Sequence, residues 1–145
     1  MMDAKLIADI EAAEGCKLTA YKDSLGFPTI GYGHLLDNSI SWDGYTITQA
    51  QADAFLESDV QKWAIWAQSL PEWPDLDTAC RKNAVIELAF NMGKKWLLFA
   101  NCRAAIERQD WQAAHDQLLS SLWASQVHAT RANRLAGYLL TGEYP

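Results

Sequence analysis

Apolar residues in the first 32 positions change from helical spacing to short strand-like runs. A helix is predicted for residues 3–14, with Gly15 as its stop and one apolar face formed by Leu6, Ile7 and Ile10. Residues 18–21 and 29–32 have the character of short strands, and the "KDSLGFP" between them is rich in turn formers. The pattern predicts a β-hairpin or small sheet, which "DNSISWDG" continues as a loop or a third strand.

After this segment the pattern becomes helical. Thr48 and Gln51 have the spacing of a capping box, and helical spacing then continues as far as Pro71, through Leu56, Val60, Trp63, Ala67 and Leu70. Another helix is predicted from Thr78 to Met92, with Gly93 as its stop and with Val85, Leu88 and Met92 facing inward. Three shorter helices are expected near 101–108, 110–120 and 130–140, with Asn101, Asp110 and Thr130 as candidate N-caps.

These elements predict an α+β protein made of one domain, residues 1–145. A small β-containing lobe is expected over about 15–46, and residues 1–14 and 47–145 are expected to be helical. The long helix that starts at Thr48 would join the two lobes. Because ligands tend to bind in clefts between lobes, we expect a site there.

The charge, tryptophan and cysteine content of the chain limit the kinds of function that it can have. The net charge of −6 argues against a general nucleic-acid binder, although residues 1–77 carry −9 and residues 78–145 carry +3. The seven tryptophans suit core packing, and they also suit stacking on sugar rings. The three cysteines show no metal-ligand or disulfide pattern, so we expect no metal site and folding in a reducing cytoplasm. No cofactor is expected either, because proton transfer and charge stabilisation by side chains suffice for acid–base chemistry. The N-terminus lacks the pattern of a signal peptide, and no stretch is apolar enough for stable membrane insertion.

The most specific candidate chemistry lies in "EGCKLTAYKDSLGFPTIGYGH", residues 14–34. Hydrolysis of a glycosidic bond requires a proton donor and a second carboxylate, with room for a water between them in inverting enzymes. Glu14 at a helix end suits the partly buried acid, and Asp23 in a polar turn suits an ionised carboxylate. Thr29 at the start of the returning strand suits a residue that shares a water with Asp23. A helix end, a turn former and a β-branched strand residue would also explain these three residues, so spacing alone leaves both interpretations open.

The same stretch resembles the signature of T4-type phage lysozymes, the endolysins of glycoside hydrolase family 24. The resemblance continues through "ITQAQADAFLESDV", "AVIELAFNMG" and the C-terminal "DWQAAHDQLLSSLWASQVHATRANRLAGYLLTGEY". It implies a lysozyme-like fold and a muramidase that cleaves the β-1,4 bond between N-acetylmuramic acid and N-acetylglucosamine, with inversion. It places the general acid on Glu14, the second carboxylate on Asp23 and the water-positioning threonine on Thr29.

Further residues follow from the same resemblance. His34 is similar to a structural histidine that pairs with an aspartate on the long helix, here Asp59. Expected substrate contacts, each with a structural alternative, are Leu35, Phe90, Asn91, Gln126 and Arg131. Because "QVHATR" is one residue longer than the "QTPNR" of many relatives, Arg134 is an alternative to Arg131.

The implied setting is host lysis. We expect a monomer that accumulates in the host cytoplasm, reaches the peptidoglycan through a holin-type membrane permeabiliser, and does not bind nucleic acid. Three rivals stay open: a lytic transglycosylase, a catalytically idle wall-binding or inhibitory protein, and a lysozyme module of a phage tail.

Overall fold

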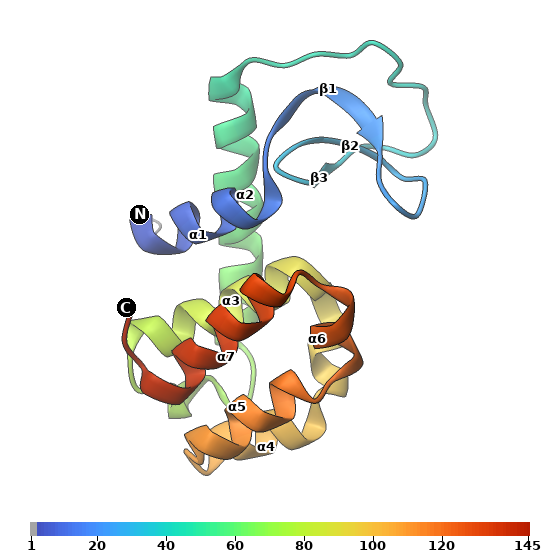
Figure 1. Ribbon diagram of the computed structural model, residues 1–145. Coiled ribbons are helices and arrows are strands. Elements are labelled where there is room, and N and C mark those ends of the chain that lie inside the picture. Colours follow the sequence, from blue (N-terminus) through green and yellow to red (C-terminus); the bar gives the residue numbers. More distant parts are fainter. Residues whose placement is uncertain (1–2) are drawn as a thin grey trace. The chain divides into compact units, whose positions relative to one another are not determined.

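The computed structural model describes residues 3–145 (Figure 1). Contacts divide the chain into two compact units, Met1–Lys62 and Trp63–Pro145. The division falls within helix α2, Gln49–Gln68, so the first unit contains more than the β lobe expected at 15–46. No helix within residues 3–145 combines the length and apolar character needed to cross a membrane.

The first unit begins with helix α1, Ala4–Glu14, as the apolar spacing predicts. The carboxylate of Asp3 caps it by accepting hydrogen bonds from two backbone N–H groups at 2.9 and 3.2 Å. Gly15 ends it with φ at 67°, a conformation that glycine adopts readily. The predicted apolar face is buried at Leu6 and Ile10, which are 2% and 0% exposed, and half-buried at Ile7.

A three-stranded antiparallel sheet follows α1, in the order β1-β2-β3 (Figure 1). Its strands are β1, Lys17–Lys22, β2, Pro28–Gly31, and β3, His34–Leu35. The predicted hairpin is confirmed, although each strand is shifted by about one residue at its ends. The third strand lies before "DNSISWDG" rather than within it, and that stretch forms turns and loop. Gly31 ends β2 with φ at 66°, a conformation in which a larger side chain would be strained.

The capping box at the start of α2 is confirmed in both directions. The Thr48 N–H donates to Gln51 Oε1 at 2.9 Å, and the Gln51 N–H donates to Thr48 Oγ1 at 3.1 Å. Buried residues then recur along α2 at helical spacing, at Ala52, Leu56, Val60, Ala64 and Ala67.

The second unit is helical. Its main helices are α3, Ala79–Met92, α4, Ala100–Glu107, α5, Trp111–Leu119, and α7, Ala129–Thr141. Shorter elements complete it: η1, Trp73–Asp75, η2, Gly93–Leu98, and α6, Leu122–Gln126, of which none was predicted separately. Helix α7 packs against α3 and α5, and α5 also packs against α4. The core between them includes Val85, Leu88, Trp96, Leu118, Leu135 and Leu139.

The three candidate N-caps have different outcomes. Asp110 caps α5 as predicted, because its carboxylate accepts the Ala113 N–H at 3.1 Å. Asn101 and Thr130 are wrong as N-caps, since α4 and α7 begin one residue before each of them. The ring of His128 accepts the Thr130 N–H at 3.4 Å and so takes the capping role at α7.

Two buried carboxylates organise the second unit. Glu72 is 0% exposed, and its two oxygens accept from Trp96 Nε1 at 2.8 Å and from Arg103 Nε and Nη2 at 2.8 and 3.0 Å. Glu87 is 1% exposed and accepts from Arg131 Nε at 3.0 Å and from Arg134 at 2.7 and 2.9 Å. Apolar periodicity carries no information on buried ion pairs. For this reason the burial of Glu72 and Glu87 was not predicted from the sequence.

We predict that Arg103→Met lowers the free energy of unfolding by about 3–5 kcal/mol, because it leaves the buried Glu72 carboxylate without its cation. The matched control is Arg108→Met. The Arg108 side chain is 57% exposed and lies 3.6 Å from Asp110, so its loss should change stability by less than about 1 kcal/mol. Urea denaturation of both variants checks this, and equal losses would contradict the assigned role of Glu72.

Candidate functional site

Glu14 is the last residue of α1, so its position depends on where that helix ends. Its side chain is half-buried. A Cβ added to Gly33 would lie 3.4 Å from Glu14 Oε2, which shows that the carboxylate faces the turn between β2 and β3. Gly33 also has φ at 79°, so a larger side chain there would be strained and would crowd Glu14.

Asp23 is fixed by the backbone of the β1–β2 turn. Its Oδ1 accepts hydrogen bonds from the N–H groups of Leu25 and Phe27, each at 2.9 Å. Its own N–H donates to the Phe27 carbonyl at 2.9 Å, and its carbonyl accepts from Gly26 at the same distance. Both side-chain bonds end on Oδ1, so Oδ2 is the oxygen that this turn leaves for another donor.

Thr29 lies on β2, directly opposite Tyr21 of β1, and is 2% exposed. Its hydroxyl donates to the Phe27 carbonyl at 2.9 Å. A hydroxyl has one proton and two lone pairs, so the Oγ1 of Thr29 can only accept from any further partner. The Phe27 carbonyl receives hydrogen bonds from both Asp23 and Thr29 and thereby holds these two residues in one arrangement.

Tyr21 belongs to the same group and was not among the predicted site residues. Burial raises its pKa, and the negative charges of Glu14 and Asp23 raise it further because they disfavour a phenolate. The Nζ of Lys17 also lies 4.3 Å from the centroid of the Tyr21 ring. The available sequence signal was its place in the hairpin, two positions before Asp23.

His34 connects β3 to α2. Its Nδ1 lies 2.8 Å from Oδ2 of Asp59, the aspartate named from the sequence. Its ring stacks on Phe55, with centroids 4.3 Å apart and planes inclined by 6°. The two contacts hold the imidazole on the surface of α2. Leu35, the next residue of β3, is 62% exposed.

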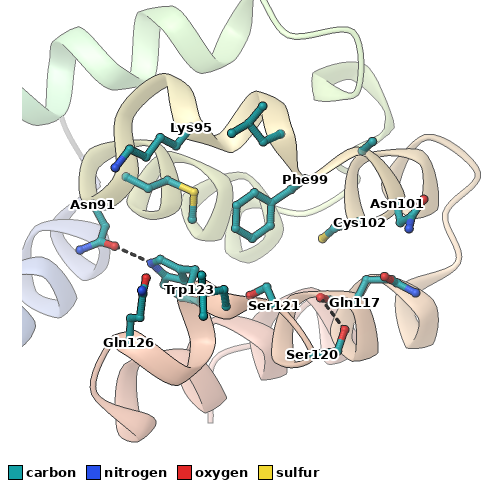
Figure 2. A pocket seen from close by; sticks show the side chains of 14 residues that line it. Asn91, Lys95, Phe99, Asn101, Cys102, Gln117, Ser120, Ser121, Trp123 and Gln126 are labelled. Carbon is teal, nitrogen blue, oxygen red and sulfur yellow. Dashed lines mark hydrogen bonds between the residues drawn. The ribbon is translucent and has the colours of Figure 1, made fainter.

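The remaining predicted residues lie in the second unit, where a pocket of about 820 Å³ opens beside α6 (Figure 2). Asn91 and Gln126 line this pocket, together with Trp123, whose Nε1 donates to Asn91 Oδ1 at 2.6 Å. Phe90 is half-buried on α3 and is not part of the lining. Trp123 was not predicted as a site residue, and nothing in its spacing along α6 distinguishes it from a packing residue.

Arg131 is 8% exposed, and its Nε donates to the buried Glu87. Arg134, the alternative, donates two hydrogen bonds to the same carboxylate. These contacts favour the structural alternative weighed for Arg131, in which it stabilises a helix junction. Within residues 3–145, no group of three His, Cys, Asp or Glu side chains is arranged to hold a metal ion.

Comparison with known proteins places the chain in a family. The sequence model of the family described as phage lysozyme matches residues 11–137. The chain is 29% identical to "Probable T4-type lysozyme 1" of Dictyostelium discoideum, a match that covers 89% of each chain. It is 33% identical to the "Endolysin" of Salmonella phage P22, over 81% of this chain and 79% of the relative.

A further relative has a different architecture. The chain is 28% identical to the "Pre-baseplate central spike protein Gp5" of Enterobacteria phage T4, over 89% of its own length but only 26% of that protein. The family match covers both the carboxylates of the first unit and the pocket of the second. The chain is a glycoside hydrolase of the lysozyme type and belongs to the phage lysozyme family.

Proposed function

We propose that the chain hydrolyses the β-1,4 bond between N-acetylmuramic acid and N-acetylglucosamine in bacterial peptidoglycan. The observation that carries this proposal is the arrangement of Asp23 and Thr29 around the Phe27 carbonyl, in the same unit in which Glu14 ends α1. The family assignment supports it, because lysozymes are glycoside hydrolases. Two carboxylates suffice for such a reaction, through proton transfer and charge stabilisation.

Glu14 is the general acid of the proposed mechanism. It protonates the glycosidic oxygen while the bond to the sugar breaks, so that the leaving group departs as a neutral alcohol. Its place at the end of α1 supports this role, since the last turn of the helix fixes the backbone from which the carboxyl extends. The glycine at position 33 leaves space beside that carboxyl.

Asp23 and Thr29 direct the attacking water. The water donates one hydrogen bond to Asp23 Oδ2 and the other to Thr29 Oγ1, which leaves a lone pair for the anomeric carbon. As the new C–O bond forms, Asp23 takes one proton from the water, and the other proton stays on the new hydroxyl group. The hydrogen bonds of the turn support this assignment, because they occupy Asp23 Oδ1 and the Thr29 proton. A water that attacks from the face opposite the leaving group inverts the anomeric configuration.

Substrate contacts are proposed for Leu35, Phe90, Asn91 and Gln126. Asn91 and Gln126 have amides that suit the acetamido and peptide groups of the wall polymer. Arg131 is less suited, because it is buried against Glu87. His34 and Asp59 are proposed as a structural pair.

The biological role that we propose is host cell lysis. The similarity to the endolysin of Salmonella phage P22 extends over most of both chains, whereas the T4 spike protein is matched over about a quarter of its length. The similarity to this endolysin is the basis of the proposed role. The proposed enzyme is a monomer that accumulates in the host cytoplasm and reaches the wall when a holin-type protein permeabilises the membrane.

We predict that Glu14→Gln lowers peptidoglycan turnover by about 10²- to 10⁴-fold, because the amide cannot donate the required proton. Lysis of chloroform-treated Gram-negative cells, followed by turbidity, measures the effect. The matched control is Glu11→Gln, on the same helix and outside the site, which should stay near wild type. Near-normal lysis by Glu14→Gln would rule out the general-acid role.

Asp23→Asn separates the charge of Asp23 from its role in the turn. The amide oxygen of the introduced asparagine still accepts from Leu25 and Phe27, so thermal unfolding should be near wild type while turnover falls by about 10²-fold or more. Asp23→Ala should lose the turnover and also about 1–2 kcal/mol of stability, whereas Asp23→Glu should keep some activity. Full activity in Asp23→Asn would show that no charge is needed at this position.

The products distinguish hydrolysis from its rival. A hydrolase releases a reducing N-acetylmuramic acid, and inversion predicts the α-anomer as the first product of the β-linked substrate. Rapid proton NMR of the products from purified peptidoglycan reads the configuration, and mass spectrometry reads the composition. An anhydro-muramyl product would identify a lytic transglycosylase, and a β-anomer would exclude the water-directed scheme.

A further inference from the structure

A second pocket, of about 370 Å³, lies in the first unit beside the β1–β2 hairpin. Its volume is in the range of small-ligand sites, roughly 300–1,000 Å³. The lining comes from the end of β1, the start of β2 and the loop segment 38–43. In Figure 1 the chain between β3 and α2 passes beside this hairpin. Glu14, Asp23 and Thr29 are not among the described residues that line the pocket, so it is separate from the candidate catalytic arrangement.

The loop that forms one wall of this pocket is held by its own hydrogen bonds. The Asp37 carboxylate accepts from the N–H and the hydroxyl of Ser39 at 2.9 and 2.7 Å, and these two bonds lower the pKa of Asp37. The Tyr45 N–H donates to the Trp42 carbonyl at 2.9 Å, and the Ala20 N–H donates to the Tyr45 carbonyl at 2.8 Å. The loop is therefore closed on itself and attached to β1, so this wall is largely preformed, as ligand sites usually are.

Trp42 contributes an aromatic surface to the pocket and not a free hydrogen-bond donor. Its indole N–H already donates to the Asp37 carbonyl at 2.7 Å. The ring is half-buried, lines the pocket and meets the Tyr45 ring edge-on, with centroids 5.0 Å apart and planes inclined by 60°. These two contacts fix the orientation of the indole. An indole whose donor is already used offers a flat apolar surface, which suits the apolar face of a sugar ring.

The polar side chains of the lining suit a neutral ligand that carries hydroxyl groups. Lys22 and Asp43 supply one charge of each sign, so together they favour neither an anion nor a cation. The amide of Asn38 and the hydroxyl of Ser41 can each donate and accept hydrogen bonds. A sugar hydroxyl also donates and accepts, whereas a carboxylate can only accept. This lining therefore matches a pyranose ring better than it matches a charged ligand.

We propose that this pocket is a carbohydrate-binding site, in which Trp42 stacks on a pyranose ring and the polar side chains around it bind the ring hydroxyls. The proposal rests on the proposed function, because the ring is assigned to the glycan strand that the enzyme cleaves. Lys22 precedes Asp23 and Pro28 precedes Thr29, so the pocket and these candidate catalytic residues share one hairpin. A strand bound here is thereby kept close to the proposed reaction centre. Other surface polysaccharides also contain pyranose rings, and the test separates the two sources.

Proton–nitrogen NMR in the Glu14→Gln background, where turnover is suppressed, locates the binding directly. One probe is a peptide-free N-acetylglucosamine pentamer. The other is cellopentaose, a β-1,4 oligomer of glucose that has no acetamido groups. The indole signal of Trp42, identified by its absence in Trp42→Phe, and the backbone amide signals of residues 38–43 should shift on titration.

Substitutions then test which part of the lining carries the affinity. Trp42→Ala removes the ring and should lower the affinity of this site about tenfold, whereas Trp42→Phe keeps an aromatic surface and should retain most of it. Asn38→Ala should weaken binding by about two- to fivefold. The matched control is Gln61→Ala, an exposed amide of the same unit outside the pocket, which should leave affinity unchanged. Thermal unfolding of each variant shows whether the fold is retained, and Asn38→Ala still decides the test if Trp42→Ala does not fold.

The same substitution gives a kinetic readout in the enzyme with Glu14 intact. A polymer held at two places loses one of them in Trp42→Ala, so the apparent KM for purified peptidoglycan should rise by roughly three- to tenfold. The kcat should stay at the wild-type value, because Trp42 does not belong to the proposed catalytic arrangement.

Each outcome decides the proposal. Shifts of the Trp42 and 38–43 signals with the N-acetylglucosamine pentamer support a carbohydrate site for the glycan strand, and shifts with cellopentaose alone support one for another polysaccharide. Shifts confined to the surroundings of Glu14, Asp23 and Thr29, or unchanged affinity in folded Trp42→Ala or Asn38→Ala, would overturn the proposal. Failure of the catalytic proposal is distinguishable, because it appears as lysis by Glu14→Gln and does not depend on Trp42.

Discussion

The carbonyl group of Phe27 is the centre on which the candidate site of the first unit depends. It accepts hydrogen bonds from the backbone of Asp23 and from the hydroxyl of Thr29, while the Phe27 N–H donates to the Asp23 side chain. Phe27, whose side chain has no reactive group, thereby fixes the position of the Asp23 carboxylate relative to the Thr29 hydroxyl. The turn is short and is closed by these bonds, so it holds the pair with little freedom, as preorganised sites require.

The second unit is organised by charge rather than by a backbone turn. Glu72 ties η1 to α4 through Arg103, and Glu87 ties α3 to α7 through Arg131 and Arg134. Buried ion pairs contribute little net stability, but removing one partner is costly, so they resist change one residue at a time. Three of the eight basic residues of 78–145 are therefore paired with buried carboxylates.

The sequence predicted the local elements well because their signals are local. The Thr48 capping box and the turn residues around Asp23 act within four positions, so their outcome does not depend on the rest of the chain. Partners distant in sequence were harder to find. The pairing of His34 with Asp59 was named only through the family resemblance, and the contact between Trp123 and Asn91 was not found, because apolar periodicity carries no information on side-chain partners 25 or 32 positions apart.

Asp23 combines a structural role with a proposed chemical one, and this combination limits which substitutions are tolerated at its position. In many enzymes the reactive residues lower stability, so that mutants without them gain in stability while losing activity. Here the same carboxylate closes the hairpin through Oδ1 and is assigned to chemistry through Oδ2. Selection for a stable hairpin therefore favours Asp or Asn at this position, and a lineage released from selection for activity would still tend to keep one of the two.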